Sequence, residues 1–168
     1  ETGFGTGLNF LLTLKLYMSL NEQVLQTNLH FISTEISPLT RLQIQQSLRC
    51  FPSLSDELSL LLEQYPETFS QKCEIKLLNE RVTLTLLFQD STDALSKLSN
   101  RKTGLVDAWY LDGFSPTRNP QMWQTPLFRE IARLSKPQAT ISSFTVAGHV
   151  RRKLTDVGFR LAKKTYIG

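Results

Sequence analysis

The feature that most constrains the fold of this 168-residue chain is a glycine at every second position near its start: Gly3, Gly5 and Gly7. Glycine tolerates a positive φ and leaves no Cβ in the path of a ligand. The residues that follow, 10–18, carry apolar side chains at the spacing of one helical face, and a helix start offers unpaired N–H groups. The pattern predicts a loop that holds a nucleotide-like ligand; a plain turn between strand and helix is the alternative.

An acid, Glu1, stands two positions before the first of these glycines. Loops that bind dinucleotides favour G-x-G-x-x-G spacing, with the pyrophosphate at the helix N-terminus. A carboxylate at Glu1 would repel a pyrophosphate, whereas it would favour a ligand that carries an ammonium and a sulfonium, as S-adenosylmethionine does. The spacing therefore disfavours a nicotinamide-dependent oxidoreductase.

The remainder of the chain alternates predicted strands and helices. We expect strands at 29–33, 82–88, 106–111 and 139–144, a hairpin partner at 74–78, and the beginning of a last strand at 159–165. We expect a helix that has Pro38 in its first turn and ends near Phe51, and further helices at 56–65, 92–98, 122–134 and 148–157. Alternation of this kind predicts an α/β fold with a mostly parallel, doubly wound sheet.

The order of elements also suggests how the chain relates to a whole domain. A glycine loop of this kind normally follows a strand, and here the chain begins at the loop and stops soon after its last predicted strand begins. We therefore expect residues 1–168 to form one core that is truncated at both ends. The first strand of a doubly wound sheet lies in its centre, so its absence predicts a gap there.

Two further acids follow predicted strands. Glu35 comes after the strand at 29–33, where a carboxylate can accept hydrogen bonds from both ribose hydroxyls. Asp90 follows the strand at 82–88, where it can accept a hydrogen bond from an adenine amino group. Either acid alone could be a surface cap. Together with Glu1 and the glycines, they favour a nucleoside ligand beyond the carboxyl ends of the strands.

Composition excludes several classes of protein. The longest apolar stretch, residues 8–20, is interrupted by polar side chains, so we expect no membrane span. Cys50 and Cys73 form no C-x-x-C pair, which fits a reducing, cytoplasmic location. His30 and His149 form no metal pattern, so we expect no metal, and His30 is interpreted as structural. The net charge of +4 is compatible with an anionic partner without identifying one.

The segment after the strand at 106–111 is bounded by prolines and rich in aromatic and polar residues. Asp112, at the strand end, would point at the methyl donor. Phe114 and Trp123 could stack on a flat base. The alternative is that the aromatics of this region are only core, and for Trp109 and Tyr110, inside the strand, that interpretation is preferred.

The chain here resembles the methyltransferase domain of the bifunctional tRNA 5-methylaminomethyl-2-thiouridine biosynthesis protein family. The matching motifs are E-x-G-F-G-T-G-L-N-F at 1–10, R-V-T-L-T-L-L-F at 81–88, D-G-F-[AS]-P-x-[KR]-N-P-x-M-W at 112–123 and F-T-x-A-G-x-V-R-R at 144–152. The resemblance spans nearly the whole chain. It implies a Rossmann-like S-adenosylmethionine-dependent methyltransferase core over residues 1–168.

The resemblance also implies a reaction and partners. The family methylates the aminomethyl group of 5-aminomethyl-2-thiouridine at the wobble position of tRNA, giving 5-methylaminomethyl-2-thiouridine. In many bacteria an FAD-dependent oxidase domain on the same chain makes the amine, and other members are free-standing. S-adenosylmethionine is thus the expected cofactor and tRNA the expected partner. FAD is expected only if an oxidase domain exists elsewhere in the natural chain.

The candidate residues fall into two groups. We assign cofactor binding to Glu1, Gly3, Gly5, Gly7, Asn9, Glu35, Asp90 and Asp112. We assign substrate binding to Phe114, Arg118, Asn119, Trp123, Arg151 and Arg152. Asp112 is also the catalytic candidate, because a carboxylate can orient the attacking amine and help take up its proton. The three arginines, with Lys153, could contact tRNA phosphates, and a solvated helix face is the alternative.

Two other functions remain open. One is a different transferase with the same cofactor fold, acting on a small molecule such as a polyamine; the proline-bounded loop that ends in Met122 and Trp123 argues against it. The other is an inactive module that binds tRNA or docks to another domain. The intact set of acids and glycines argues against loss of activity, although the boundaries alone could make this fragment inactive.

Overall fold

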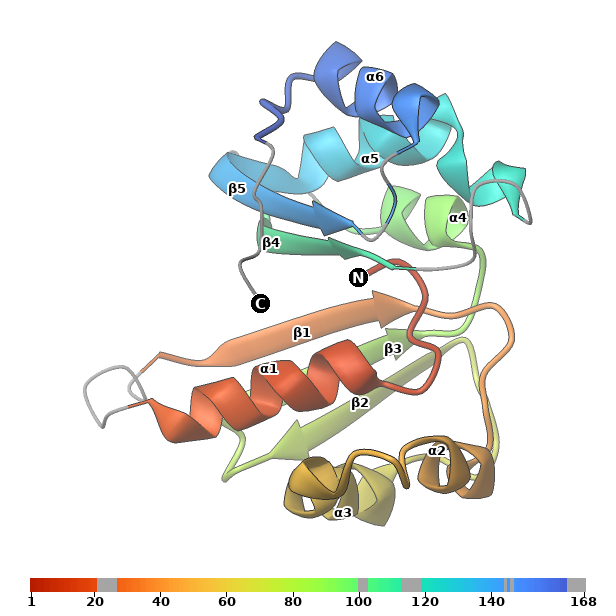
Figure 1. The fold of residues 1–168 in the computed structure, drawn as a ribbon, viewed down its shortest axis with the longest axis vertical. Helices are drawn as coiled ribbons and strands as arrows, with labels where there is room; N and C mark the ends of the chain where they lie inside the picture. The colour runs from red at the N-terminus through yellow and green to blue at the C-terminus, as the bar shows by residue number, and fades with distance from the viewer. Residues whose placement is uncertain (21–26, 100–102, 113–118, 144, 146, 163–168) are drawn as a thin grey trace. The chain divides into compact units, whose positions relative to one another are not determined.

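The computed structural model describes residues 1–20, 27–99, 103–112, 119–143, 145 and 147–162. The chain divides into two compact units, Glu1–Ser91 (unit 1) and Thr92–Gly168 (unit 2). Each unit is a mixture of helices and strands (Figure 1).

Unit 1 is built on a three-stranded sheet in the order β1-β3-β2. Its strands are β1 (Leu29–Thr34), β2 (Lys72–Leu77) and β3 (Val82–Leu87), and its helices are α1 (Leu8–Ser19), α2 (Arg41–Ser47), the 3-10 helix η2 (Pro52–Leu54) and α3 (Ser55–Gln64). β1 and β3 are parallel, whereas β2 and β3 are antiparallel. The predicted hairpin is therefore confirmed, and β3 is the central strand.

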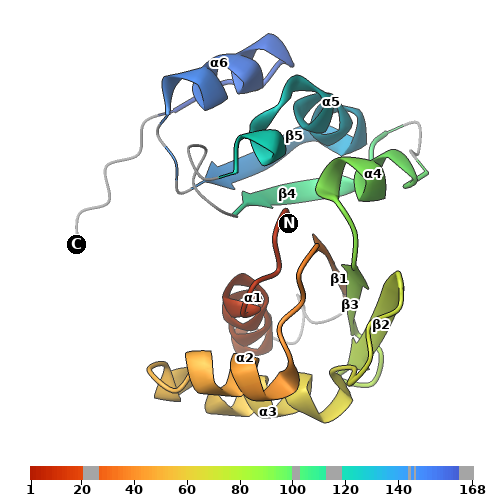
Figure 2. The same ribbon diagram turned by 90° about the vertical axis from the view of Figure 1, so that its right-hand side faces the viewer.

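Helix α1 covers one face of this sheet (Figure 2). Its buried residues, Phe10, Leu11, Leu14 and Tyr17, follow the helical spacing seen in the sequence. The ring of Phe10 meets that of Phe31 on β1 edge to face, with centroids 5.3 Å apart. The core of unit 1 thus fixes the helix that follows the glycine loop.

The residues ahead of the glycine loop are paired in parallel with β1. The backbone N of Glu1 donates to Ile32 O at 2.8 Å, and Thr34 N donates to Glu1 O at 3.2 Å. A further bridge joins Thr2 to Thr34. These contacts use the edge of β1 that β3 does not occupy. The loop therefore leaves from an extended, hydrogen-bonded segment at the carboxyl end of β1.

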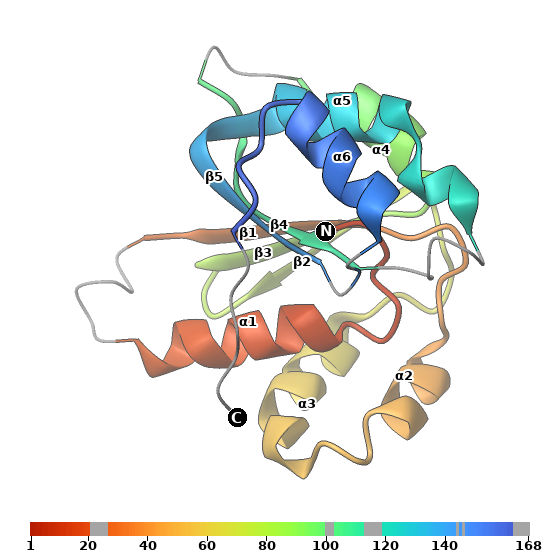
Figure 3. The same cartoon turned by 45° about the horizontal axis from the view of Figure 1, so that its top comes forward.

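Unit 2 contains the parallel strands β4 (Val106–Leu111) and β5 (Ser135–Ser143). Its other elements are α4 (Ser91–Ser96), which begins at the last residue of unit 1, η3 (Pro120–Trp123), α5 (Thr125–Leu134) and α6 (Gly148–Asp156). Helices α5 and α6 pack side by side (Figure 3). A buried cluster that includes Trp109, Leu111, Phe128 and Ile131 forms the core, so the interpretation of Trp109 as a core residue is confirmed.

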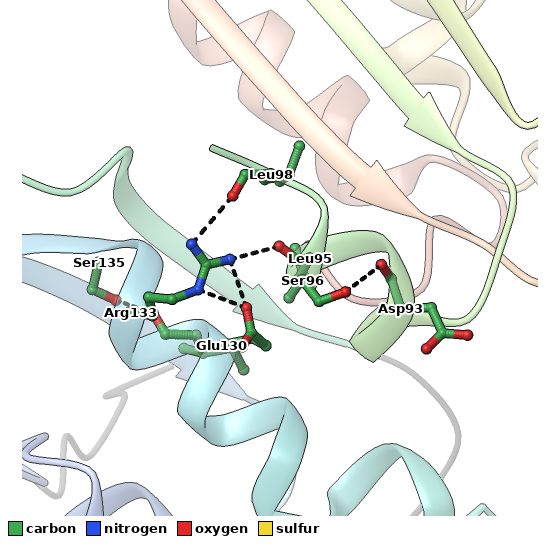
Figure 4. A network of polar contacts seen from close by, with 8 residues as sticks. Asp93, Leu95, Ser96, Leu98, Glu130, Arg133 and Ser135 are labelled. Atoms are coloured by element: carbon green, nitrogen blue, oxygen red, sulfur yellow. Dashed lines mark hydrogen bonds and ion pairs between the residues drawn. The ribbon is translucent and has the colours of Figure 1, made fainter. Parts of the chain in front are cut away.

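One arginine closes the end of α4. Arg133 on α5 donates from Nη2 to Leu95 O at 2.8 Å and from Nη1 to Leu98 O at 3.2 Å (Figure 4). Glu130, one turn earlier, accepts from its Nε at 2.7 Å. The guanidinium therefore binds the carbonyl of Leu95 in the last turn of α4 and that of Leu98 just after the helix.

Two predicted boundaries in unit 2 are wrong. The helix expected at 122–134 is split, because Gln124 is extended and α5 begins only at Thr125, with Pro126 in its first turn. Proline lacks an N–H and is tolerated in the first turn but not in a helix interior. β5 begins at Ser135 rather than at 139, and a register shift opposite Val106 and Ala108 accommodates the additional residues.

The last predicted strand is not supported where the structure describes it. Residues 159–162 form neither helix nor strand, and the rest of that prediction, 163–165, lies outside the described residues. The mixed α/β character with parallel strand pairs is as expected, while the described strands form a three-stranded and a two-stranded sheet.

Candidate functional site

The glycine loop is fixed by hydrogen bonds at both of its ends. Gly3 and Phe4 both donate their backbone N–H to Thr34 O, each at 3.0 Å, and Gly7 N donates to Phe4 O at 2.8 Å. Gly3, Gly5 and Gly7 all have a positive φ, of 91°, 52° and 78°. Residues that carry a side chain rarely adopt this backbone conformation, so the loop needs glycine at these positions.

Gly5 and Gly7 differ in what surrounds them. A Cβ on Gly7 would lie 2.8 Å from Cζ of Phe4, a buried side chain, whereas a Cβ on Gly5 would meet nothing within 4 Å. The ring of Phe4 is in turn stacked on Tyr65, with centroids 6.3 Å apart. Gly7 is therefore required by packing inside the unit, and Gly5 presents open backbone on which a ligand can rest.

Tyr65 is a buried support for the loop. Its hydroxyl donates to Leu39 O at 3.1 Å, and its own carbonyl accepts from Nη2 of Arg41 at 2.6 Å. Burial, reinforced by the negative charge of Glu35, raises the pKa of Tyr65 to about 12. The phenol is therefore neutral at physiological pH and suits a structural role rather than that of a base.

Glu35 lies directly after β1 and faces the loop. Its Oε2 accepts the N–H of Gly5 at 2.9 Å, and its Oε1 accepts the N–H of Ser37 at 2.8 Å. The side chain is only partly buried. The acid predicted to bind the ribose is thus held beside Gly5, the glycine with open space above it.

Glu1 is the most enclosed of the candidate acids. It is only 8% exposed, and its carboxylate accepts hydrogen bonds from Nδ2 of Asn9 and from Oγ of Ser33, each at 2.8 Å. Asn9, a cofactor candidate from the sequence, therefore contacts Glu1 directly. Ser33 was not identified from the sequence; its only signal there was a polar residue inside an apolar strand.

Asp90 lies three residues after β3, directly before α4, and is partly buried. The next residue, Ser91, shares a 2.6 Å hydrogen bond with Thr34 at the end of β1. Glu1, Glu35 and Asp90 of unit 1 are thus all found where neighbouring parallel strands end, which is the edge at which such folds bind ligands.

In unit 2, Asp112 follows β4 directly and its side chain is exposed. Asp107, at the other end of the same strand, forms an ion pair with Lys136, its Oδ2 lying 2.8 Å from Nζ. Phe114 and Arg118, two substrate candidates, lie outside the described residues. Because the side chain of Asp112 is exposed, a substrate can reach it.

The remaining substrate candidates have contrasting surroundings. Asn119 is partly buried at the start of η3, and Trp123, at 4% exposed, packs in the core of unit 2. The burial gives Trp123 a packing role, and stacking on a base stays a prediction. Arg151 and Arg152 are exposed on α6, whereas Lys153 is turned inward and donates to Trp123 O at 2.5 Å.

His30 agrees with its structural interpretation. The ring lies on β1 and its Nε2 is 2.9 Å from Oγ1 of Thr85 on β3. Burial lowers the pKa of His30 below its ordinary value. Across the described part of the chain, no three His, Cys, Asp or Glu side chains gather where they could share a metal ion. No helix among the described residues is long and apolar enough to cross a membrane.

Comparison with known proteins defines the class. A family model described as S-adenosyl-L-methionine-dependent methyltransferase matches residues 52–168, and the chain belongs to this family. The backbone of Gly5, with open space around it, lies beside the Glu35 carboxylate, an acceptor of the kind that ribose hydroxyls need.

Several similar relatives share one name, tRNA 5-methylaminomethyl-2-thiouridine biosynthesis bifunctional protein MnmC. The chain is 44% identical over 166 residues to that of Pseudoalteromonas atlantica and 45% identical over 167 residues to that of Aeromonas hydrophila, matching 98% and 97% of this chain. That of Pseudomonas fluorescens is 44% identical over the whole chain. The chain spans about a quarter of the length of these relatives. The family resemblance found in the motifs is confirmed.

Proposed function

We propose that this chain methylates the aminomethyl nitrogen of 5-aminomethyl-2-thiouridine at the wobble position of tRNA, giving 5-methylaminomethyl-2-thiouridine. The observation that carries the proposal is the identity of 44–45% over nearly the whole chain to proteins named for this modification. The methyltransferase family match and the arrangement of acids and glycines in unit 1 support it.

Residues of unit 1 would hold the cofactor. Gly3 and Gly7 would give the loop its backbone course, Gly5 would allow close approach of the ligand, and Glu35 would offer carboxylate oxygens to the ribose. The acids supply the negative potential that favours a cation over a pyrophosphate. Asn9 would act on the cofactor through its hydrogen bond to Glu1, and Asp90 would accept a hydrogen bond from the adenine amino group.

S-adenosylmethionine, when bound, supplies a methyl group on a positively charged sulfur that is already a good leaving group. The protein then mainly has to position the amine and keep its lone pair available. Asp112 would orient the amine and take up its proton, and its exposure at the end of β4 supports access to solvent and substrate. Phe114 and Trp123 would hold the uracil ring, and Asn119 would contact its polar edge.

Further partners follow from the same proposal. Arg151 and Arg152, exposed on α6, and Arg118 would contact tRNA phosphates and make binding sensitive to salt. The amine substrate would come from an FAD-dependent oxidase domain, in cis or in trans, and the activity would be cytoplasmic, where tRNA is modified.

We also propose that the complete domain has the Rossmann-like, mostly parallel and doubly wound sheet predicted from the sequence. The alternation of helices with the parallel pairs β1/β3 and β4/β5 supports this arrangement.

The test is transfer of a labelled methyl group from S-adenosylmethionine to tRNA that carries the aminomethyl precursor. The full-length protein should convert the precursor nucleoside to its N-methyl form, identified by mass spectrometry after digestion. Methylation of a polyamine in place of tRNA would favour the other transferase class. Binding of tRNA without any transfer would favour the inactive module.

A further inference from the structure

Glu1 is a buried acid whose two carboxylate oxygens are held from two different elements. Oε1 accepts from Nδ2 of Asn9 in the first turn of α1, and Oε2 accepts from Oγ of Ser33 in β1, both at 2.8 Å. Ser33 is fully buried. The backbone of Glu1 is itself fixed to β1 through Ile32 and Thr34. The position of the carboxylate is therefore determined by the helix and the strand together.

The chemistry of the two donors explains what they preserve. A carboxylate that leaves water loses much solvation free energy unless hydrogen bonds replace its water contacts. An amide and a hydroxyl provide such bonds, and bonds to a charged acceptor are stronger than neutral ones. Because both donors are uncharged, they hold the carboxylate without cancelling its negative charge. In a poorly solvated environment that charge acts strongly on a nearby cation.

We infer that Asn9 and Ser33 are positioning residues that hold Glu1 as the charge-selective part of the cofactor site. This inference rests on the proposed function. Asn9 and Ser33 both act on the cofactor indirectly, because each donates a hydrogen bond to the Glu1 carboxylate. Without either donor, the buried carboxylate loses one of the two hydrogen bonds that fix its position, and selectivity for a positively charged ligand weakens.

Three ligands separate this role from general support of the loop. S-adenosylmethionine carries a sulfonium, an ammonium and a carboxylate. S-adenosylhomocysteine keeps the ammonium and the carboxylate but has a neutral sulfur, and 5′-methylthioadenosine carries no charge. All three share the adenosine that the rest of the site would bind. A defect in charge selection therefore weakens the first two ligands and spares the third.

The experiment measures the dissociation constants of these ligands by calorimetry on the full-length protein. Asn9→Leu and Ser33→Ala should each weaken S-adenosylmethionine binding about tenfold, the usual scale for a lost hydrogen bond to a charged group. Affinity for 5′-methylthioadenosine should change by less than about twofold, and Asn9→Gln, which keeps the amide donor, should restore part of the loss.

Two controls match these variants in position. Thr13→Val lies one turn after Asn9 on α1, where its hydroxyl donates to Asn9 O at 2.7 Å. Thr85→Val removes a buried hydroxyl on β3 that contacts His30 rather than Glu1. Neither control should change the affinity for any of the three ligands, and thermal unfolding shows that each variant is folded. If Asn9→Leu does not fold, Ser33→Ala, which removes a single oxygen, carries the test.

Equal weakening of all three ligands, or unchanged affinity for S-adenosylmethionine in both variants, would overturn the inference. Failure of the proposed function looks different. In that case the protein without any substitution either does not bind S-adenosylmethionine or does not methylate the tRNA precursor.

Discussion

Glu1 in unit 1 and Asp112 in unit 2 are both acids near the carboxyl ends of parallel strands, yet their surroundings are opposite. Glu1 is 8% exposed and held by Asn9 and Ser33, whereas Asp112 is exposed directly after β4. A group that has to present a constant charge benefits from burial among fixed donors. A group that has to accept and release a proton needs access to substrate and water. The contrast supports our proposal that Glu1 serves cofactor binding and Asp112 serves the chemistry.

The largest effect is expected at Asp112. Asp112→Asn keeps the shape but cannot take up the proton of the amine, so the single-turnover rate of methyl transfer should fall about 100-fold or more. Asp107→Asn, at the other end of β4, is the matched control, because Asp107 is ion-paired with Lys136 away from the strand end. An unchanged rate in Asp112→Asn would remove this residue from the chemistry.

Gly7 should matter for stability more than for binding. Gly7→Ala places a Cβ 2.8 Å from the ring of Phe4, in a backbone with φ of 78°. Overpacking and a left-handed backbone together should lower the free energy of unfolding by about 2–4 kcal/mol, measured by urea denaturation. Phe4→Leu in the same chain should recover part of the loss. If it recovers none, the Phe4 contact is not the cause.

Gly5 should matter for ligand binding more than for stability. Gly5→Ala adds a methyl group that meets no other part of the protein within 4 Å and would project into the space that we propose the ligand occupies. The affinity for S-adenosylmethionine should fall about tenfold, while the free energy of unfolding falls by about 1 kcal/mol through backbone strain alone. Gly158→Ala is the control, because it also has a positive φ and open surroundings. Equal binding by both variants would contradict a ligand at Gly5.

The smallest effect is expected at Tyr65. Tyr65→Phe removes the hydrogen bond to Leu39 and should cost about 1 kcal/mol of unfolding free energy near neutral pH. Because the folded pKa of Tyr65 is raised to about 12, the unfolded state loses this proton first. The stabilisation is therefore complete below about pH 10 and is lost as the pH rises toward 12. The free energies of unfolding of Tyr65→Phe and of the protein with Tyr65 should therefore converge over that pH range. A difference that stays constant as the pH rises would contradict this prediction.

Much of unit 1 could be predicted from the sequence. Helical spacing predicted α1, the strand pattern at 82–88 predicted β3, and the order of elements placed Glu35 after a strand, because these signals are local. The contact of Phe4 with Gly7 and that of Ser33 with Glu1 could not be predicted, since each joins residues whose distance depends on tertiary packing.

Unit 2 was harder for the same reason. We predicted one helix over 122–134, whereas α5 begins only at Thr125, with Pro126 in its first turn. Lys153 was grouped with Arg151 and Arg152 as a basic run, and only the fold shows that it binds the carbonyl of Trp123. Charge alone does not distinguish a side chain that faces solvent from one that closes a local structure.

Calorimetric titration of the full-length protein with S-adenosylmethionine and, separately, with NADH tests the assignment of binding to the glycine loop most directly. Saturable heat with the sulfonium ligand and none with the dinucleotide is the expected result. Saturable binding of NADH with no response to S-adenosylmethionine would contradict the interpretation of Glu1 and the glycines as a site for a positively charged nucleoside.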